Sequence, residues 1–369
     1  MVNYLEIVFS GDLVLDESHP EHWLSGITPA LHNADLAIGH LEVPHTRSAR
    51  ELNWDIPAPG ADPDHLAALF EAGFGALTLA GNHMSDCGEE GIIDTREGVN
   101  RLGMACCGAG VDLIEARRPA ILSIAGRRIS ILSYNCVGPE KGWATETKAG
   151  VAFVRIETAD GSPITPSAFL EKASSQSVCS MQQDIISAKE NADILIVALH
   201  KGIVHTPALL APYEQPIAYA AIDAGADIVI GHHAHIIRGI EFYREKPIFH
   251  GLGNGCVVTR ALNPDQDHPL RSDWALKRKE LFGFEPDPEY YLAPFHPQAV
   301  NSMLGFVRWY NNGRIETGFI PVYVEPPGRP VIAESAKANE IIDYVKKITE
   351  KAGLSPLSLN IKKNIVVVS

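Results

Sequence analysis

Short apolar runs recur along the chain, and each of them ends at a cluster of polar residues. These runs cover residues 5–12, 34–42, 74–83, 127–135, 192–202, 226–235 and 246–254. Strands that are apolar at nearly every position are usually covered on both faces of their sheet. Apolar residues at helical spacing predict helices over residues 62–74, 89–103, 180–192 and 216–226. This alternation of strands and helices predicts an α/β fold with much parallel sheet.

Two regions interrupt the alternation. Residues 139–180 include a serine-rich stretch, and residues 259–298 hold many charges, prolines and aromatic side chains. We interpret both as loops or insertions outside the core that cover a site as lids. Their aromatic and histidine side chains are candidate pocket residues: Trp143, Trp274, Tyr290, Tyr291, Phe295 and His296.

The last part of the chain has a different pattern. Residues 303–324 predict a β-hairpin whose turn is formed by Asn311, Asn312 and Gly313. Residues 335–369 predict a C-terminal helix and tail. Within it, the helix covers 343–353 and a last edge strand covers 364–369. We expect residues 1–369 to form a single domain.

The polar clusters that end the apolar runs share one position, the carboxyl end of a predicted strand. They contain Asp12, Glu42, Asn82, His83, His200, His233, His235 and Asn254. Ligands bind at this edge of open α/β sheets, so we expect these side chains to converge. Carboxylates and imidazoles in one place suit a pair of zinc, iron or manganese ions. Glu42 is placed to bridge two ions, and His83 to protonate a leaving group.

An ordered set of short motifs then identifies a family resemblance. The motifs are GD (11–12), LE (41–42), GNH (81–83), His200-x-Gly202, GHHAH (231–235) and LGN (252–254). This set resembles the calcineurin-like metallophosphoesterases, and more closely their branch named after the capsule protein CapA of poly-γ-glutamate synthesis. The resemblance implies a four-layer αββα sandwich of the metallo-dependent phosphatase type. It also implies one metal held by Asp12, Glu42 and His235, a second held by Glu42, Asn82, His200 and His233, and His83 as the acid.

Several positions depart from the motifs of this family. Val14 stands where the wider superfamily has a histidine ligand, so the first metal site loses a nitrogen. His40, Lys201 and His250 are further departures that lie beside motif residues, so we take them as candidate substrate-binding residues together with Asn254 and Trp143. Lys201 would repel cations if it points inward, would bind an anionic substrate there, or would face water. Arg238 is a candidate clamp for a substrate carboxylate.

Composition limits the partners. The formal net charge is −14, which argues against nucleic-acid binding and makes the surface a poor docking site for polyglutamate or anionic lipid. Six cysteines without a C-x-x-C pair suit a reducing compartment. We find neither a signal peptide nor an apolar stretch of roughly 20 residues, so we expect a cytoplasmic protein without a membrane partner. A homodimer stays open.

Three functions fit these observations. The first is a metal-dependent hydrolase that acts on a phosphoester, amide or ester bond of a small or peptide-like substrate. The second is a metal-free epimerase or isomerase that uses Asp12, Glu42, His83 and His235 for proton transfer. It is motivated by the incomplete first metal site and by Lys201. The third is a non-catalytic capsule or poly-γ-glutamate biosynthesis protein, which we rank last because we expect no membrane anchor.

Overall fold

The computed structural model describes residues 4–52, 54, 56, 58–165 and 168–369. Within these residues, the larger sheet has ten strands in the order β19-β20-β17-β16-β1-β2-β3-β4, with β15 beside β1 and β18 beside β17. Its strands are β1 (Tyr4–Leu15), β2 (Leu36–Leu41), β3 (Phe74–Thr78), β4 (Ala105–Cys107), β15 (Asn254–Val258), β16 (Asn301–Tyr310), β17 (Ile315–Glu325), β18 (Arg329–Ile332), β19 (Leu359–Lys362) and β20 (Ile365–Val368).

The second large sheet has six strands in the order β13-β14-β12-β11-β7-β6, again counted over the described residues. They are β6 (Ala120–Ile124), β7 (Arg127–Asn135), β11 (Ile194–Lys201), β12 (Ile228–His233), β13 (Ile240–Tyr243) and β14 (Lys246–Phe249). Two small sheets pair β5 (Ala109–Gly110) with β8 (Gly150–Val151), and β9 (Ile156–Thr158) with β10 (Leu170–Ala173). The central strands β7, β11, β12 and β14 are parallel, as the uniformly apolar runs predicted.

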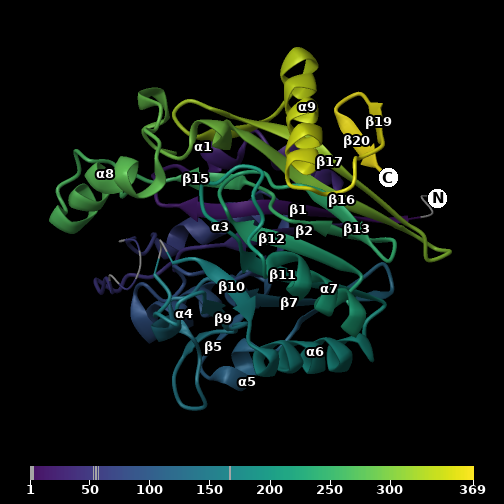
Figure 1. The fold of residues 1–369 in the computed structure, drawn as a ribbon, viewed down its shortest axis with the longest axis horizontal. Helices are drawn as coiled ribbons and strands as arrows, with labels where there is room; N and C mark the ends of the chain where they lie inside the picture. The colour runs from purple at the N-terminus through teal and green to yellow at the C-terminus, as the bar shows by residue number, and fades with distance from the viewer. Residues whose placement is uncertain (1–3, 53, 55, 57, 166–167) are drawn as a thin grey trace.

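Helices cover the outer face of each large sheet (Figure 1). The helices of the described residues are α1 (Pro20–Leu24), α2 (Thr28–Asn33), α3 (Leu66–Glu71), α4 (Gly88–Arg101), α5 (Leu113–Ala116), α6 (Ser175–Lys189), α7 (Glu214–Ala224), α8 (Pro269–Phe282) and α9 (Ser335–Lys351). Of these, α9 packs instead against the cluster between the sheets, and α8 lies to one side of the sheets, at the cavity. Helices α1 to α4 share an apolar cluster with the outer face of the larger sheet, and α6 and α7 share one with the outer face of the smaller sheet. A third cluster fills the space between the sheets. The predicted four-layer αββα sandwich is therefore confirmed.

The alternation of side chains along β11 shows how the layers form. Ile194, Ile196 and Ala198 point into the cluster between the sheets, whereas Leu195 and Val197 point toward α6 and α7. Successive side chains of a strand face opposite sides, so a strand buried on both faces must be apolar at every position. This explains why the runs in the sequence show no polar alternation.

Two predicted loop regions contain regular structure. The serine-rich stretch at 174–180 is not a loop, because α6 begins at Ser175. Residues 259–298 contain α8, a helix that sequence reasoning missed. Its apolar residues include Leu270 and Leu276, which are exposed, so the helix lacks the single apolar stripe by which a surface helix is usually recognised.

Other boundaries also differ from the predictions. The run at 246–254 is not one strand: β14 ends at Phe249 in the smaller sheet, and β15 begins at Asn254 in the larger one. The C-terminal helix begins at Ser335 rather than at 343, because Ala338 and Ile341 already face the core. The last strand, β20, is not the edge of its sheet, since β19 lies outside it. The hairpin is confirmed as β16 and β17, with Gly313 at a positive φ in the turn.

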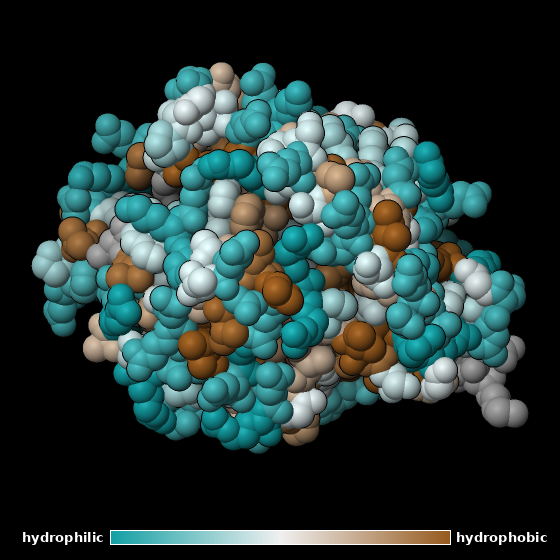
Figure 2. Space-filling view, turned by 90° about the horizontal axis from the view of Figure 1, so that it is seen from below, coloured by the Kyte–Doolittle hydropathy of each residue, from teal (hydrophilic) through white to brown (hydrophobic). Residues whose placement is uncertain are grey.

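The surface is mostly polar where Figure 2 shows it. This face, seen from below in Figure 1, carries hydrophobic side chains in separate small groups among hydrophilic ones. No helix in the described part of the chain is long and apolar enough to cross a membrane. Four of the six cysteines are buried, Cys106 is partly buried and Cys179 is exposed.

Candidate metal centre

Asp12 reaches the space between the sheets because β1 contains an irregularity. Leu5, Ile7 and Phe9 face inward at odd positions, but after Ser10 and Gly11 the inward positions become even. The pairing with β2 advances by three residues on β1 and by two on β2 at this point, which is the mark of a β-bulge. The bulge turns the Asp12 carboxylate toward the six-stranded sheet, where Oδ2 accepts the backbone N–H of His233 at 3.2 Å.

The bulge requires glycine at position 11. The backbone N–H of Asp12 donates to the carbonyl of Gly253 at 3.1 Å, on the segment that crosses from β14 to β15. A Cβ atom at position 11 would lie 1.9 Å from the same carbonyl oxygen, closer than any side chain allows. The motifs Gly-Asp and Leu-Gly-Asn, far apart in sequence, are therefore two sides of one close backbone contact.

Glu42 lies at the middle of the predicted cluster. It follows β2, its backbone N–H donates to Leu13, and its side chain is 1% exposed. Oε1 lies 3.4 Å from Nε2 of His235 and 3.8 Å from Nε2 of His200. Neither carboxylate oxygen has a hydrogen-bond partner within the described residues. A buried carboxylate without hydrogen bonds is costly, and a divalent cation would compensate it.

The histidines come from the ends of β11 and β12. His200 Nε2 lies 2.8 Å from the side-chain oxygen of Asn82, on the loop after β3. His233 and His235 both have positive φ, at 88° and 54°, a conformation that histidine adopts only at a cost. The strained turn directs both rings to the centre, as the His-x-His spacing predicted.

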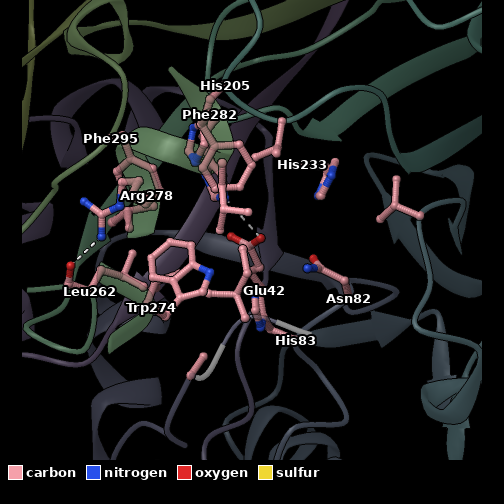
Figure 3. A pocket seen from close by; sticks show the side chains of 18 of the residues that line it. Glu42, Asn82, His83, His205, His233, Leu262, Trp274, Arg278, Phe282 and Phe295 are labelled. Atoms are coloured by element: carbon pink, nitrogen blue, oxygen red, sulfur yellow. Dashed lines mark hydrogen bonds and ion pairs between the residues drawn. The ribbon is translucent and has the colours of Figure 1, made fainter. Parts of the chain in front are cut away.

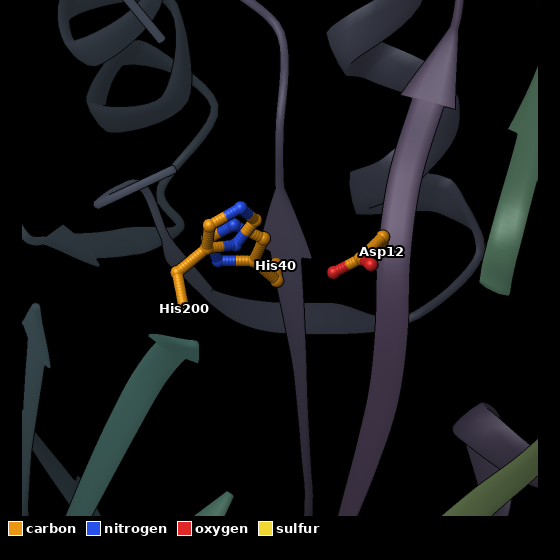
Figure 4. Close-up of side chains that lie close together, drawn as sticks. All are labelled: Asp12, His40 and His200. Atoms are coloured by element: carbon orange, nitrogen blue, oxygen red, sulfur yellow. The ribbon is translucent and has the colours of Figure 1, made fainter. Parts of the chain in front are cut away.

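Three groups of side chains in the described structure have ligand atoms within 4.8 Å of one another. Two of them share Glu42: one adds Asp12 and His235, and the other adds His200 and His233. The third contains Asp12, His40 and His200, whose two imidazole rings are stacked with their centroids 4.7 Å apart (Figure 4). The first two groups correspond to the two metal sites implied by the resemblance, with Asn82 at hydrogen-bond distance from the second.

The protonation states of Glu42, His200 and His233 suit metal ligands. Burial raises the pKa of a carboxyl group, but the neighbouring His235 lowers the pKa of Glu42 to about 2, so Glu42 is ionised. Burial lowers the pKa of His233 to about 3 and the pKa of His200 well below its usual value. Burial lowers that of His235 as well, but Glu42 outweighs it and raises the pKa to about 9. His200 and His233 are therefore neutral, the form that binds divalent ions, whereas His235 carries a proton that it would release on binding an ion. Together with the ionised Glu42, these residues fit such a centre.

Three residues near the centre were not singled out from the sequence. Asp86 Oδ2 accepts a hydrogen bond from Nδ1 of His83 at 2.6 Å and so fixes its ring. His232, the second residue of GHHAH, is buried, and its Nδ1 lies 3.3 Å from Oδ1 of Asp12. His205, in the loop after β11, stacks on His235 with centroids 5.7 Å apart. Of these three residues, only Asp86 had a signal in the sequence. It stands three positions after His83, and residues i and i+3 of a turn can contact each other.

Several predicted substrate-binding residues are buried near the centre and do not line its cavity. Lys201 and His250 are fully buried and hydrogen-bonded to each other, and Lys201 also pairs with Glu214. Arg238 is 1% exposed and donates to the backbone carbonyls of Ile203 and Leu209. None of these three is among the described residues that line the cavity at the centre.

The other candidates have different places. Trp143 is buried and stacks on Phe153 with centroids 4.1 Å apart, away from the cavity. Asn254 supports a ligand, since its side-chain oxygen lies 2.8 Å from Nδ1 of His235. His40 is enclosed by His200 and His232, and burial lowers its pKa to about 3.

A cavity of about 340 Å³ opens onto the centre. Glu42, Asn82, His83, His233 and His235 are among its polar lining residues. In Figure 3, Trp274 and Phe295 lie on one side of Glu42, and Asn82 and His233 on the other. Of the other expected lid residues, Tyr290 and His296 line a separate small cavity. Five of the predicted carboxyl-end residues thus line one cavity, whereas Asp12, His200 and Asn254 are buried and do not line it.

Comparison with known proteins identifies the family of the chain. Residues 6–257 match the family model described as "Bacterial capsule synthesis protein PGA_cap", more than half of the chain, so the protein belongs to this family. The chain is similar to the capsule biosynthesis protein CapA of Bacillus anthracis, with 28% identity over 62% of this chain and 52% of the relative. It is also similar to the PGA biosynthesis protein CapA of Bacillus subtilis, with 27% identity over 71% of this chain and 63% of the relative. The chain therefore spans less than two thirds of the length of either relative.

Among solved structures, the calcineurin-like phosphoesterase YfkN from Bacillus subtilis is similar over 95% of this chain and 96% of that chain. The identity is 10% and the TM-score 0.40, which is too distant to bear on activity.

Proposed function

We propose that the protein is a metal-dependent hydrolase that cleaves an amide, ester or phosphoester bond in a small or peptide-like substrate. One observation carries the proposal: Glu42 is buried, both its oxygens lack hydrogen bonds within the described residues, and it belongs to two ligand groups whose His233 and His235 line the same cavity as Glu42. A carboxylate in this position is typical of the bridge between two metal ions.

Two sets of residues would bind the metal ions in this reaction. Asp12, Glu42 and His235 would hold one divalent ion, and Glu42, Asn82, His200 and His233 the second. A bound pair polarises a carbonyl or phosphoryl oxygen and lowers the pKa of water. The side-chain oxygen of Asn254 is hydrogen-bonded to Nδ1 of His235, so that Nε2 of His235 points at Glu42. Such a hydrogen bond fixes the tautomer and orientation of a ligand histidine.

His83 supplies the proton for the leaving group in this proposal. Its Nδ1 donates to Asp86, and the side chain lines the cavity beside Asn82. Asp86 orients the ring and stabilises its protonated form, as a carboxylate does for a catalytic histidine. General acid catalysis of this kind contributes roughly 10²–10⁴-fold to a rate.

The relatives guide the choice of test substrates. Their names refer to capsule and PGA biosynthesis, so a γ-glutamyl amide is a natural first substrate, and a p-nitrophenyl phosphoester tests phosphorus chemistry. Purified protein is expected to contain manganese, iron or zinc by elemental analysis. Treatment with EDTA should abolish activity, and return of one of these ions should restore it.

A matched pair of variants controls this experiment. Glu42→Gln should lose both metal and activity, whereas Glu97→Gln, on an exposed position of α4, should retain both. Full activity in metal-stripped protein would contradict the proposal and favour metal-free epimerisation, which solvent deuterium at Cα would reveal. Unchanged biological function in His83→Ala would instead favour a non-catalytic role in capsule biosynthesis.

A further inference from the structure

An apolar wall faces the polar side of the cavity. It is formed by α8 and by segments on either side of it, and its residues are Leu262, Trp274, Leu281, Phe282, Pro294 and Phe295. In Figure 3, Trp274 and Phe295 lie across the cavity from Asn82 and His233, and the ring centroid of Phe295 is 4.5 Å from that of His235. The wall is therefore next to the bond that the centre would cleave.

The wall is continuous with the ligand histidines. The ring of Phe295 lies 4.5 Å from that of His235, and His205 meets the rings of Phe282 and Phe284 edge-on at 5.1 Å. Aromatic rings at these separations form a packed surface that accepts another ring or an apolar chain. At the mouth, Phe169 and Leu281 are both about half exposed, so the entrance is apolar as well.

The charged residues that line the cavity also favour an apolar ligand. Among its described lining residues, Arg278 is the one lysine or arginine. Arg278 is 3% exposed, and its guanidinium donates to the backbone carbonyls of Leu262 and Pro294 and lies over the ring of Trp274 at 4.9 Å. Arg278 therefore holds the wall together and is not directed at a ligand. Asp16 and Glu42 add negative charge. Away from the metal centre and its histidines, no described lining residue other than Arg278 offers a cation, so burying the carboxylates of a γ-glutamyl chain against this wall is costly.

We infer that this cavity takes a substrate with a ring-sized apolar substituent beside the scissile bond, rather than a run of γ-glutamyl residues. The inference rests on the proposed hydrolase function for the position of the bond, but the preference for an apolar group rests on the wall itself. A matched hydrophobic pocket discriminates by about 10–200-fold for even one methylene.

The first experiment compares two dipeptides on the metal-loaded protein. Hydrolysis of γ-glutamyl-phenylalanine should exceed that of γ-glutamyl-glutamate by at least about tenfold in kcat/KM. Equal rates, or faster cleavage of γ-glutamyl-glutamate, would overturn the inference.

A binding experiment separates the inference from the proposed function. Two compounds are titrated into the full chain by calorimetry. One is N-acetyl-phenylalaninamide, and the other is the acidic compound N-acetyl-glutamic acid amide. Tighter binding of the phenylalanine compound by at least about tenfold supports the inference even if neither dipeptide is cleaved, a result that would count against the hydrolase alone. Equal affinity, or preference for the acidic compound, overturns it.

Variants locate the binding group. Phe282→Ala should weaken binding of the phenylalanine compound by about tenfold or more, and Phe282→Leu should retain most of it. Leu276→Ala is the matched control, because Leu276 lies on the same helix with 70% of its surface exposed. An equal effect of Phe282→Ala and Leu276→Ala would overturn the assignment, and the ligand comparison on the unaltered protein decides the case if Phe282→Ala does not fold.

Discussion

The ammonium group of Lys201 lies 2.7 Å from a carboxylate oxygen of Glu214, and both side chains are fully buried. The pair joins the end of β11 to the start of α7. The other oxygen of Glu214 accepts the backbone N–H of Ala211 at 2.7 Å, so the pair also holds the loop between them. This loop contributes Ile203 and His205 to the cavity. The buried pair therefore acts on the shape of the site without contacting it.

Loss of one member of this pair should be costly. Lys201→Met leaves an ionised carboxylate buried and should lower the free energy of unfolding by about 3–5 kcal/mol. Lys246→Met is the control, because Lys246 pairs with Asp227 where both side chains are partly exposed, and about 1 kcal/mol or less is expected. Urea denaturation measures both. A similar small effect for the two variants would contradict the role given to the Lys201 pair.

The same pair predicts a dependence of stability on pH. Burial raises the pKa of Glu214, but Lys201 outweighs it, and the pKa is lowered from its ordinary 4.5. A carboxyl group with a lowered pKa in the folded state stabilises the protein above pH 4.5, and this contribution is lost as pH falls through the lowered value. The stability difference between the wild type and Lys201→Met/Glu214→Leu should be constant from pH 7 to 5. Below pH 4.5 the wild type should lose stability relative to the double variant.

The contact between Gly11 and Gly253 gives a third prediction. Gly11→Ala should destabilise the protein by more than about 2 kcal/mol and reduce its metal content, because the bulge that directs Asp12 must move. Gly103→Ala separates steric overlap from backbone strain, since Gly103 has φ of 85° with no atom within 4 Å of an added Cβ. About 1 kcal/mol is expected there. Retention of full metal content in Gly11→Ala would disprove the link to Asp12.

His83 and Asp86 should affect the chemical step rather than metal binding. His83→Ala is expected to lower kcat by roughly 10²–10⁴-fold with unchanged metal content, and Asp86→Asn by roughly 10–100-fold. Both losses should shrink for substrates with a p-nitrophenyl or p-nitroanilide leaving group, which needs less protonation. Steady-state kinetics on good and poor leaving groups measures this, and equal losses for both would exclude a proton donor at position 83.

The strand-end rule predicted most of the candidate centre from the sequence. Glu42, Asn82 and His235 follow buried strands, and His200 and His233 lie in the last two residues of theirs, so the carboxyl ends bring them to one edge. Asp12 lies within β1 and joins them because of the bulge in that strand. The two ligand groups that share Glu42 agree with that prediction. The fold was predictable for the same reason, because strands covered on both faces leave a strong apolar signal.

The substrate residues were less predictable, since proximity to a motif does not determine the face of a strand. Lys201 follows His200, and successive side chains on β11 alternate, so His200 and Lys201 face opposite sides of the sheet. Lys201 therefore meets Glu214 on α7, as the alternation itself implied. Helix α8 could not be recognised, because exposed Leu270 and Leu276 interrupt any apolar stripe. His205 lies in an irregular loop, where spacing carries no information about direction.

The ligand groups span the boundary between the two sheets: Glu42 follows β2 of the larger sheet, and His200 and His233 end β11 and β12 of the smaller one. An ion shared among them is a cross-link between the two halves of the sandwich. The folded state should then gain about 2.7 kcal/mol when the free ion concentration is a hundredfold above its dissociation constant. Thermal unfolding at increasing free manganese or zinc would measure this gain, and an unfolding temperature independent of ion concentration would contradict it. In a cell, the supply of trace metal would thereby govern how long each copy of the protein survives.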